Sequence, residues 1–228
     1  FDEVDIPVRQ QRELLPRQFF LAAAPTCLTG GAVLTLVLIQ QGGLSPVTYL
    51  VIGLALLLVV MYAVPPLRLV YTTYGDLVQA ILLANLFPAL AGLLQTGEIY
   101  RILPAVTFPL TLIYLVMALA HAFPGYAADI TEDKNKNLVR RIGWQNAVGL
   151  HNILLLTAYL MMAGVTVLGL PWGIFGPALL TLPVALFQIW QILRIAGGSA
   201  VNWRTLVVTA SGTLVLTIYL LTYRLWTW

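Results

Sequence analysis

The chain has 228 residues, of which 60% are hydrophobic and 9% are charged, and its mean hydropathy is +0.88. About a quarter of the residues in an ordinary soluble domain are charged. Twelve basic and nine acidic side chains are too few to cover a soluble surface of this size. The composition excludes a soluble enzyme, a disordered chain and a fibre, and it predicts an all-α integral membrane protein.

Seven apolar runs are long enough to cross a bilayer as helices, which takes about 20 residues each. Glycine and proline residues separate the runs, and the runs are too long and too uniformly apolar for barrel strands. We therefore expect one transmembrane domain over residues 1–228. The predicted spans are 19–39, 47–64, 76–95, 103–123, 146–168, 173–193 and 205–225.

The charged residues gather on one side of this predicted bundle, which holds segments 1–18, 65–75, 124–145 and 194–204. Ten of the 12 basic residues lie there, so the positive-inside rule makes this side cytoplasmic. Basic residues in short loops between spans do not indicate nucleic-acid binding. Eight of the nine acidic residues also lie on this side or at its border. Acids and bases on one membrane face indicate a site for both a metal ion and a phosphate.

Asp129 and Asp133 have the spacing of a metal site. They are four residues apart, so a helix would place both carboxylates on one face. Mg²⁺ prefers oxygen ligands and shares its coordination shell with substrate phosphates. Lys134, Arg140 and Arg141 follow within reach of a bound diphosphate. The alternative interpretation is a solvated loop of mixed charge.

Two further features lie on the same predicted side. Asp2 and Asp5 belong to an acidic cluster that would complete a cage for a metal ion and a diphosphate; a charged terminus is the alternative. Pro65-Pro66 ends the second predicted span, and Arg68 follows at the membrane surface. A helix stop with an arginine that reaches toward water explains the prolines equally well.

The order of these features resembles the UbiA superfamily of intramembrane prenyltransferases over essentially the whole chain. The segment from Tyr62 through Pro65-Pro66-Leu67-Arg68 to Gly75-Asp76-Leu77 is similar to that family's Y-S-x-P-P-L-R phrase and its G-E/D-L. Asp129-x-x-x-Asp133 resembles the second aspartate motif, with Asn137 in place of a glycine.

The resemblance implies a nine-span fold in which two spans precede Phe1, so that the chain is an amino-terminally truncated copy. Asp2 and Asp5 would then belong to the first aspartate motif, N-D-x-x-D-x-x-x-D. Asp2 and Asp5 are three residues apart, whereas the last two aspartates of this motif are four apart. Their alignment with the motif therefore stays open.

The activity implied by the resemblance is Mg²⁺-dependent transfer of a polyprenyl group from a polyprenyl diphosphate to an aromatic acceptor. The first candidate acceptor is 1,4-dihydroxy-2-naphthoate, from menaquinone biosynthesis. The resemblance also implies that the protein lies in a bacterial inner membrane with its active-site loops on the cytoplasmic side. Tyr62 and Tyr126 would line the acceptor region. The implied metal ligands are Asp129, Asp133, Asp2 and Asp5, of which the first two are catalytic, and the implied diphosphate contacts are Arg68, Lys134, Arg140 and Arg141.

A transporter-like membrane protein and an inactive prenyltransferase homologue are the alternatives. Charged residues inside the spans or inverted repeats would be typical of a transporter. The sequence places no charged residue at the centre of a predicted span. His121 and His151 lie near span ends, where a packing role competes with that of a general base.

Overall fold

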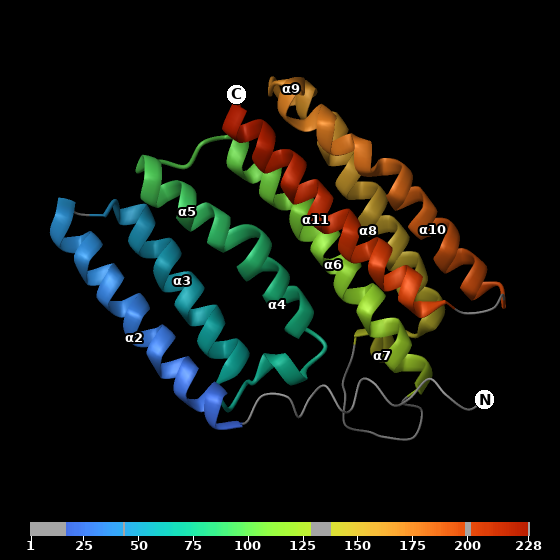
Figure 1. The fold of residues 1–228 in the computed structure, drawn as a ribbon, viewed down its shortest axis with the longest axis horizontal. Coiled ribbons are helices and arrows are strands. Elements are labelled where there is room, and N and C mark those ends of the chain that lie inside the picture. Colours follow the sequence, from blue (N-terminus) through green and yellow to red (C-terminus); the bar gives the residue numbers. More distant parts are fainter. Residues whose placement is uncertain (1–16, 43, 129–137, 199–201, 228) are drawn as a thin grey trace. The chain divides into compact units, whose positions relative to one another are not determined.

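A computed structural model of the chain describes residues 17–42, 44–128, 138–198 and 202–227. All regular structure in these residues is helical (Figure 1). The chain divides into two compact units, Phe1–Ser45 and Pro46–Trp228.

The described part of the first unit is one helix, α2 (Arg17–Gly42), at the position of the first predicted span. The hydroxyls of Thr29 and Thr35 donate to the carbonyls of Pro25 and Gly31, each at 2.8 Å. Such bonds satisfy hydroxyl groups inside an apolar helix. The apolar stretch found within α2, Pro25–Gln40, is shorter than the stretches of the second unit.

Six helical segments in the described part of the second unit are long and apolar enough to cross a membrane. They coincide with the last six predicted spans, and they indicate a multi-pass integral membrane protein. The segments are Pro46–Ala63, Gly75–Thr96, Ile102–Tyr126, Trp144–Gly164, Trp172–Ala196 and Trp203–Thr227.

The α-helices of this unit are labelled in Figure 1, and short turns lie within and between them. They are α3 (Pro46–Ala63), a 3₁₀ turn (Leu69–Tyr71), α4 (Gly75–Ile81), a π-helical turn (Leu82–Leu86), α5 (Phe87–Thr96), α6 (Ile102–Ala128), α7 (Leu138–Ile142), α8 (Trp144–Gly164), a 3₁₀ turn (Val165–Leu168), α9 (Trp172–Phe175), a 3₁₀ stretch (Gly176–Thr181), α10 (Leu182–Ala196) and α11 (Trp203–Thr227).

Prolines explain why two of the segments change helix type. Pro88 has no N–H to donate to the carbonyl four residues earlier, and its ring crowds that carbonyl. The chain widens just before it, where the Phe87 N–H bonds to the Leu82 carbonyl, five residues back. Pro177 and Pro183 similarly accompany the tighter stretch between α9 and α10. Neighbouring helices make such interruptions tolerable inside a membrane.

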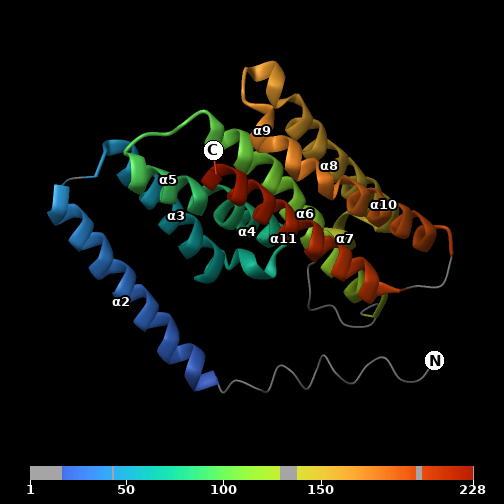
Figure 2. The same ribbon diagram turned by 45° about the horizontal axis from the view of Figure 1, so that its top comes forward.

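Helix α6 is the centre of the second unit. It packs most extensively against α8 and α11, and on another side it contacts α4, the π turn and α5 (Figures 1 and 2). Alanines at the buried contacts, among them Ala120, Ala147 and Ala158, let the helices approach closely. Close packing matters because a bilayer provides no hydrophobic drive between helices.

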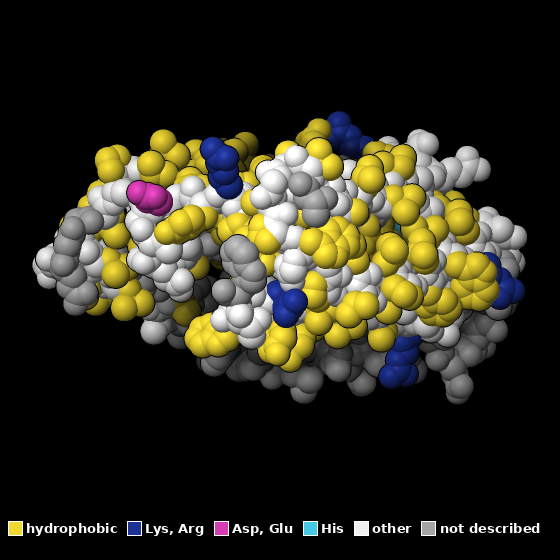
Figure 3. Space-filling view, turned by 90° about the horizontal axis from the view of Figure 1, so that it is seen from above, with side chains coloured by type: hydrophobic (Ala, Val, Ile, Leu, Met, Phe, Trp, Pro, Cys, Tyr) yellow, Lys and Arg dark blue, Asp and Glu magenta, His cyan; other side chains and the backbone are white. Residues whose placement is uncertain are grey.

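The outer faces of the helices are apolar. Leu160, Leu180 and Val208 are 73%, 73% and 61% exposed. Figure 3 shows one face of the molecule, on which hydrophobic side chains predominate and charged ones are sparse. Exposed apolar surface on this scale is typical of a surface that contacts lipid.

Candidate functional site

A row of polar side chains runs through the second unit between α3, α4, the π turn and α6. Polar and ionisable groups inside membrane spans are expensive and usually mark a functional site. We call this row the polar seam, and it consists of Tyr62, Asp76, Gln79, Asn85, Thr107 and Tyr114.

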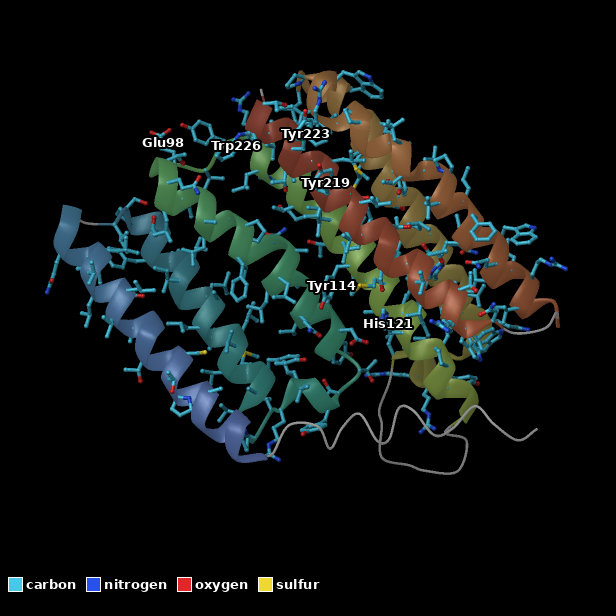
Figure 4. All side chains as sticks on the ribbon, viewed as in Figure 1. Glu98, Tyr114, His121, Tyr219, Tyr223 and Trp226 are labelled. Carbon is cyan, nitrogen blue, oxygen red and sulfur yellow. The ribbon has the colours of Figure 1, made fainter. Side chains whose placement is uncertain are left out.

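The two seam residues on helix α6, Thr107 and Tyr114, belong to a longer polar stripe on that helix. Thr107, Thr111, Tyr114 and His121 follow one another at intervals of four, three and seven residues, so they share one face of the helix. Figure 4 shows Tyr114 and His121 on α6, the latter nearer the α7 end of the bundle. Thr107 and Thr111 are buried, whereas His121 is exposed and bonds to the carbonyl of Met117.

The π turn places Asn85 in the seam. The Asn85 amide nitrogen lies 3.3 Å from the Thr107 hydroxyl oxygen and donates to it. A π turn changes the rotation per residue, so the side chains that follow Ile81 do not continue the faces of α4. Single-turn π bulges are frequent at functional sites, and here the bulge joins α4–α5 to α6 by a side-chain hydrogen bond.

Asp76 lies at the other end of the seam, in the first turn of α4, and is partly buried. Its carboxylate interacts electrostatically with the hydroxyl groups of Tyr62, on α3, and Tyr114, on α6. The Tyr62 hydroxyl also makes a long hydrogen bond of 3.5 Å to the side-chain oxygen of Gln79. Three helices therefore place one carboxylate within electrostatic range of two phenols.

The loop between α3 and α4 carries Arg68. The arginine is exposed, and its backbone is left-handed, with φ 38° and ψ 56°. A non-glycine residue held in this region is strained, and such strain is frequent at functional sites. Backbone hydrogen bonds from Tyr71 to Arg68 and from Thr72 to Leu69, of 3.0 and 2.9 Å, maintain the turn that follows.

Arg141, on the helix that follows residues 129–137 in the sequence, contacts this loop. Its guanidinium lies 5.4 Å from the centre of the Tyr74 ring, and one of its nitrogens donates to the Tyr74 hydroxyl at 3.3 Å. Fully buried Val139 anchors α7, which carries Arg140 and Arg141. Segments that are 67 residues apart in sequence thus meet beside the start of α4.

The structure brings together only part of the sequence-predicted site. Arg141 contacts the Arg68 loop through Tyr74, and Arg140 is partly buried on α7. The remaining predicted residues lie outside the described part of the chain, namely Asp2, Asp5, Asp129, Asp133 and Lys134. Among the described residues, no three His, Cys, Asp or Glu side chains gather as a metal site.

Tyr126 belongs to an aromatic cluster instead of the polar seam. It stacks on Trp144 with ring centres 6.1 Å apart, and Trp144 makes edge contacts to Phe123 and Trp203 at 5.1 and 5.9 Å. The cluster ties the end of α6 to the starts of α8 and α11. It therefore holds the two helices on either side of the segment that contains Asp129 and Asp133.

His151 is buried in a polar pair between α8 and α10. Its Nε2 accepts a hydrogen bond of 2.9 Å from the Gln188 amide, and its Nδ1 lies 3.0 Å from the Asn152 side-chain oxygen. Both His151 and Gln188 are fully buried. These contacts favour the packing role for His151 over that of a general base.

We expect His151→Phe to destabilise the bundle because it leaves the Gln188 amide buried without a partner. The cost of such a group is about 1–3 kcal/mol, which a thermal unfolding midpoint measured in detergent would show as a decrease. The double variant His151→Phe/Gln188→Leu should recover part of the loss. His121→Phe is the control, because His121 is exposed and bonds only within its own helix. An unchanged midpoint for His151→Phe would contradict the structural role.

Comparison of the chain with protein-family models, with curated proteins and with solved structures found no match.

Of the six residues of the seam, only Tyr62 has a role in the sequence prediction, and Asp76 and Tyr114 are among the five that have none. Asp76 directly precedes an apolar run and was counted with the loop charges, although a carboxylate within a helix-forming apolar segment is itself a signal. Tyr114 is visible in sequence as a member of the Thr107–Tyr114 stripe on α6. Their proximity to each other follows only from helix packing.

Proposed function

We propose that the protein is an intramembrane prenyltransferase. It transfers a polyprenyl group from a polyprenyl diphosphate to an aromatic acceptor, with Mg²⁺ as cofactor. The observation that carries this proposal is the contact between Arg141 and Tyr74. It joins the two segments that resemble the family's motifs, at the end of a seam that leads into the bundle.

The donor diphosphate would bind at this junction. Arg68, Arg140 and Arg141, with Lys134, supply cations that pair with phosphate oxygens. The resemblance assigns the Mg²⁺ ion to Asp129, Asp133, Asp2 and Asp5, whose carboxylates are the type of ligand that Mg²⁺ prefers. When bound, the ion would neutralise charge on the diphosphate as it leaves. The arginines of the chain would orient the same group and stabilise the charge that develops on it.

The interior of the bundle offers suitable surroundings for the other two groups. An isoprenoid tail requires an apolar environment, which the Leu- and Ala-rich faces of α3, α5 and α6 provide. An aromatic acceptor requires a flat apolar site with a few polar partners, and Tyr62, Asp76 and Tyr114 supply these. Both substrates would reach the site from the lipid bilayer, with the diphosphate at the cytoplasmic surface of a bacterial inner membrane.

The direct test uses the full-length protein in lipid nanodiscs with Mg²⁺ and geranylgeranyl diphosphate. Acceptors to be supplied are 1,4-dihydroxy-2-naphthoate, 4-hydroxybenzoate and homogentisate, and products are identified by mass spectrometry. We expect diphosphate release that depends on one of the acceptors and stops on addition of EDTA. Absence of any prenylated product with all acceptors and with shorter and longer donors would overturn the proposal.

Arg141→Gln tests the junction. The change removes both the hydrogen bond and the cation–π contact to Tyr74, and it removes a charge from the proposed diphosphate site. We expect the KM for the polyprenyl diphosphate to rise about tenfold, the equivalent of one lost charge-assisted contact. Tyr74→Phe keeps the ring and should have a smaller effect. Arg224→Gln, which affects a contact to the Gly173 carbonyl, serves as the charge-matched control. Equal KM values for Arg141→Gln and Arg224→Gln would exclude this role.

A transporter is the second candidate, and the observation that favours it is Asp76. Carboxylates within membrane spans are typical of ion and proton pathways. A transporter should move a solute or protons across the membrane of sealed proteoliposomes. Proteoliposomes that show no flux but form prenylated product would favour the enzyme.

A further inference from the structure

The last part of the chain carries positive charge that no acid of its own balances. Residues 138–228 contain five arginines and no aspartate, glutamate or lysine. Two of the arginines belong to the proposed donor site, and Arg224 bonds to the Gly173 carbonyl. The other two are Arg194, in the last turn of α10, and Arg204, in the first turn of α11. Both are exposed, and the proposed prenyl transfer does not use them.

Arg194 and Arg204 lie at the same end of the bundle. The Thr209 hydroxyl donates to the Gln191 side-chain oxygen at 3.0 Å, which joins α11 to α10. Arg194 lies three residues after Gln191, near the end of α10. Arg204 lies five residues before Thr209, near the start of α11. Figure 1 shows this end of the two helices on the side of the bundle where α7 lies, which is the predicted cytoplasmic side.

Aromatic rings hold Arg194 on the outer face of α10. Its guanidinium carbon lies 4.9 Å from the centre of the Trp190 ring, which is a cation–π contact. Trp190 stacks in turn on Phe187, with ring centres 5.5 Å apart. The three residues follow one another at intervals of three and four, so they share one face of the helix. A cation–π contact uses no guanidinium N–H group as a hydrogen-bond donor, so these groups stay available for a ligand.

The outer face of α10 suits the headgroup region of a membrane. The Phe187 and Trp190 rings are 44% and 50% exposed, and tryptophan in a spanning helix is enriched at the depth of the headgroups. Arginine pairs with phosphate in a planar, bidentate manner. Basic residues between spanning helices at the cytoplasmic surface bind the headgroups of anionic lipids. An anionic headgroup would supply the negative charge that residues 138–228 lack.

We propose that the end of α10 and the start of α11 form a binding site for an anionic phospholipid. Arg194 and Arg204 donate to its phosphate oxygens, and the Trp190 and Phe187 rings pack along the glycerol and the first carbons of an acyl chain. Charge complementarity at one end of two packed helices, together with the cation–π contact, carries the inference. The site is separate from the proposed donor site and does not depend on prenyl transfer.

The test measures the thermal unfolding midpoint of the full-length protein in a non-ionic detergent over a titration of phosphatidylglycerol or phosphatidylcholine. A lipid that binds only the folded protein raises the midpoint by mass action. We expect phosphatidylglycerol to raise the wild-type midpoint more than phosphatidylcholine does. Each arginine near an anionic lipid surface changes the affinity about fivefold. The half-saturating phosphatidylglycerol concentration should therefore rise about fivefold for Arg194→Gln and about 25-fold for Arg194→Gln/Arg204→Gln.

Arg224→Gln is the charge-matched control, because Arg224 lies at the opposite end of α11. Equal half-saturating concentrations for Arg194→Gln and Arg224→Gln would show only a general attraction between charges and overturn the inference. Equal stabilisation of the wild type by both lipids would overturn it too. Glycerol 1-phosphate has the phosphate without the acyl chains. If it raised the midpoint as much as phosphatidylglycerol does at the same concentration, the site would bind a free phosphate and not a lipid.

A second measurement needs no variant and so does not depend on how the variants fold. Mass spectrometry identifies the phospholipids that stay bound to the wild-type protein after purification from a bacterial membrane. We expect phosphatidylglycerol and cardiolipin to be enriched over phosphatidylethanolamine relative to the membrane from which the protein came. Bound lipids with the composition of that membrane would contradict the proposed site.

Discussion

Asp129→Asn and Asp133→Asn should each lower prenyl transfer by about three orders of magnitude or more, while the protein remains folded. A metal ion contributes several kcal/mol to transition-state charge stabilisation, and each 1.36 kcal/mol is a factor of ten in rate. Replacing a carboxylate by an amide removes the charge that holds the ion and changes the side-chain volume little. The two residues are four apart, so a helix would place both carboxylates on one face, where both could bind the ion.

The measurement is the initial rate of product formation over a Mg²⁺ titration. A weakened metal site should raise the Mg²⁺ concentration needed for half-maximal activity. A loss of fold would lower the activity at every Mg²⁺ concentration. Glu132→Gln is the neighbouring control, since a helix over this segment would rotate Glu132 by about 100° from Asp133. Full activity of both aspartate variants at low Mg²⁺ would contradict the proposal that Asp129 and Asp133 bind the metal ion. It would also contradict the resemblance on which that proposal rests.

The second large effect is expected from Gly75→Ala. Gly75 is buried at the start of α4, and a Cβ there would lie 2.6 Å from the Leu69 carbonyl oxygen and 3.3 Å from the Val70 Cα. Both are backbone atoms that cannot rotate away, so the loop carrying Arg68 and Tyr74 would have to move. A misplacement of about 1 Å in an active site can cost 10²-fold in rate, and we expect a loss of that order.

Two opposing terms act on the stability of the Gly75→Ala variant. Alanine in place of glycine favours a helix by up to about 1 kcal/mol. Overpacking against a fixed backbone costs about 1–3 kcal/mol. The second term is the larger, so the thermal midpoint should fall.

Gly149→Ala is the control, because a Cβ at that position in α8 meets nothing within 4 Å. Its midpoint should stay the same or rise slightly. A Gly75→Ala protein with wild-type midpoint and rate would show that the Leu69–Gly75 contact does not position the loop.

The positions of the helices in the second unit follow largely from the sequence. The predicted spans 47–64, 103–123 and 205–225 correspond to α3 (Pro46–Ala63), α6 and α11. The length of an apolar run is a local property, and a bilayer requires about 20 such residues in a helix. The residues at which a span changes from an α-helix to a π turn or a 3₁₀ stretch could not be predicted from the sequence. Pro88 is visible in the sequence, but the neighbouring helix determines whether the chain forms a kink or a π turn at this proline.

The sequence by itself determined that this is a membrane protein and where six of its apolar helices lie. It also determined which charged residues belong to the motif-like segments. Composition and spacing along the chain are enough for these conclusions. Only the tertiary structure decided that Asp76 lies within electrostatic range of Tyr62 and Tyr114, that Arg141 contacts Tyr74, and that His151 pairs with Gln188. Each of these contacts joins residues on different segments, and it depends on how each helix is rotated about its axis. That rotation is set by close packing around α6, which no local pattern encodes.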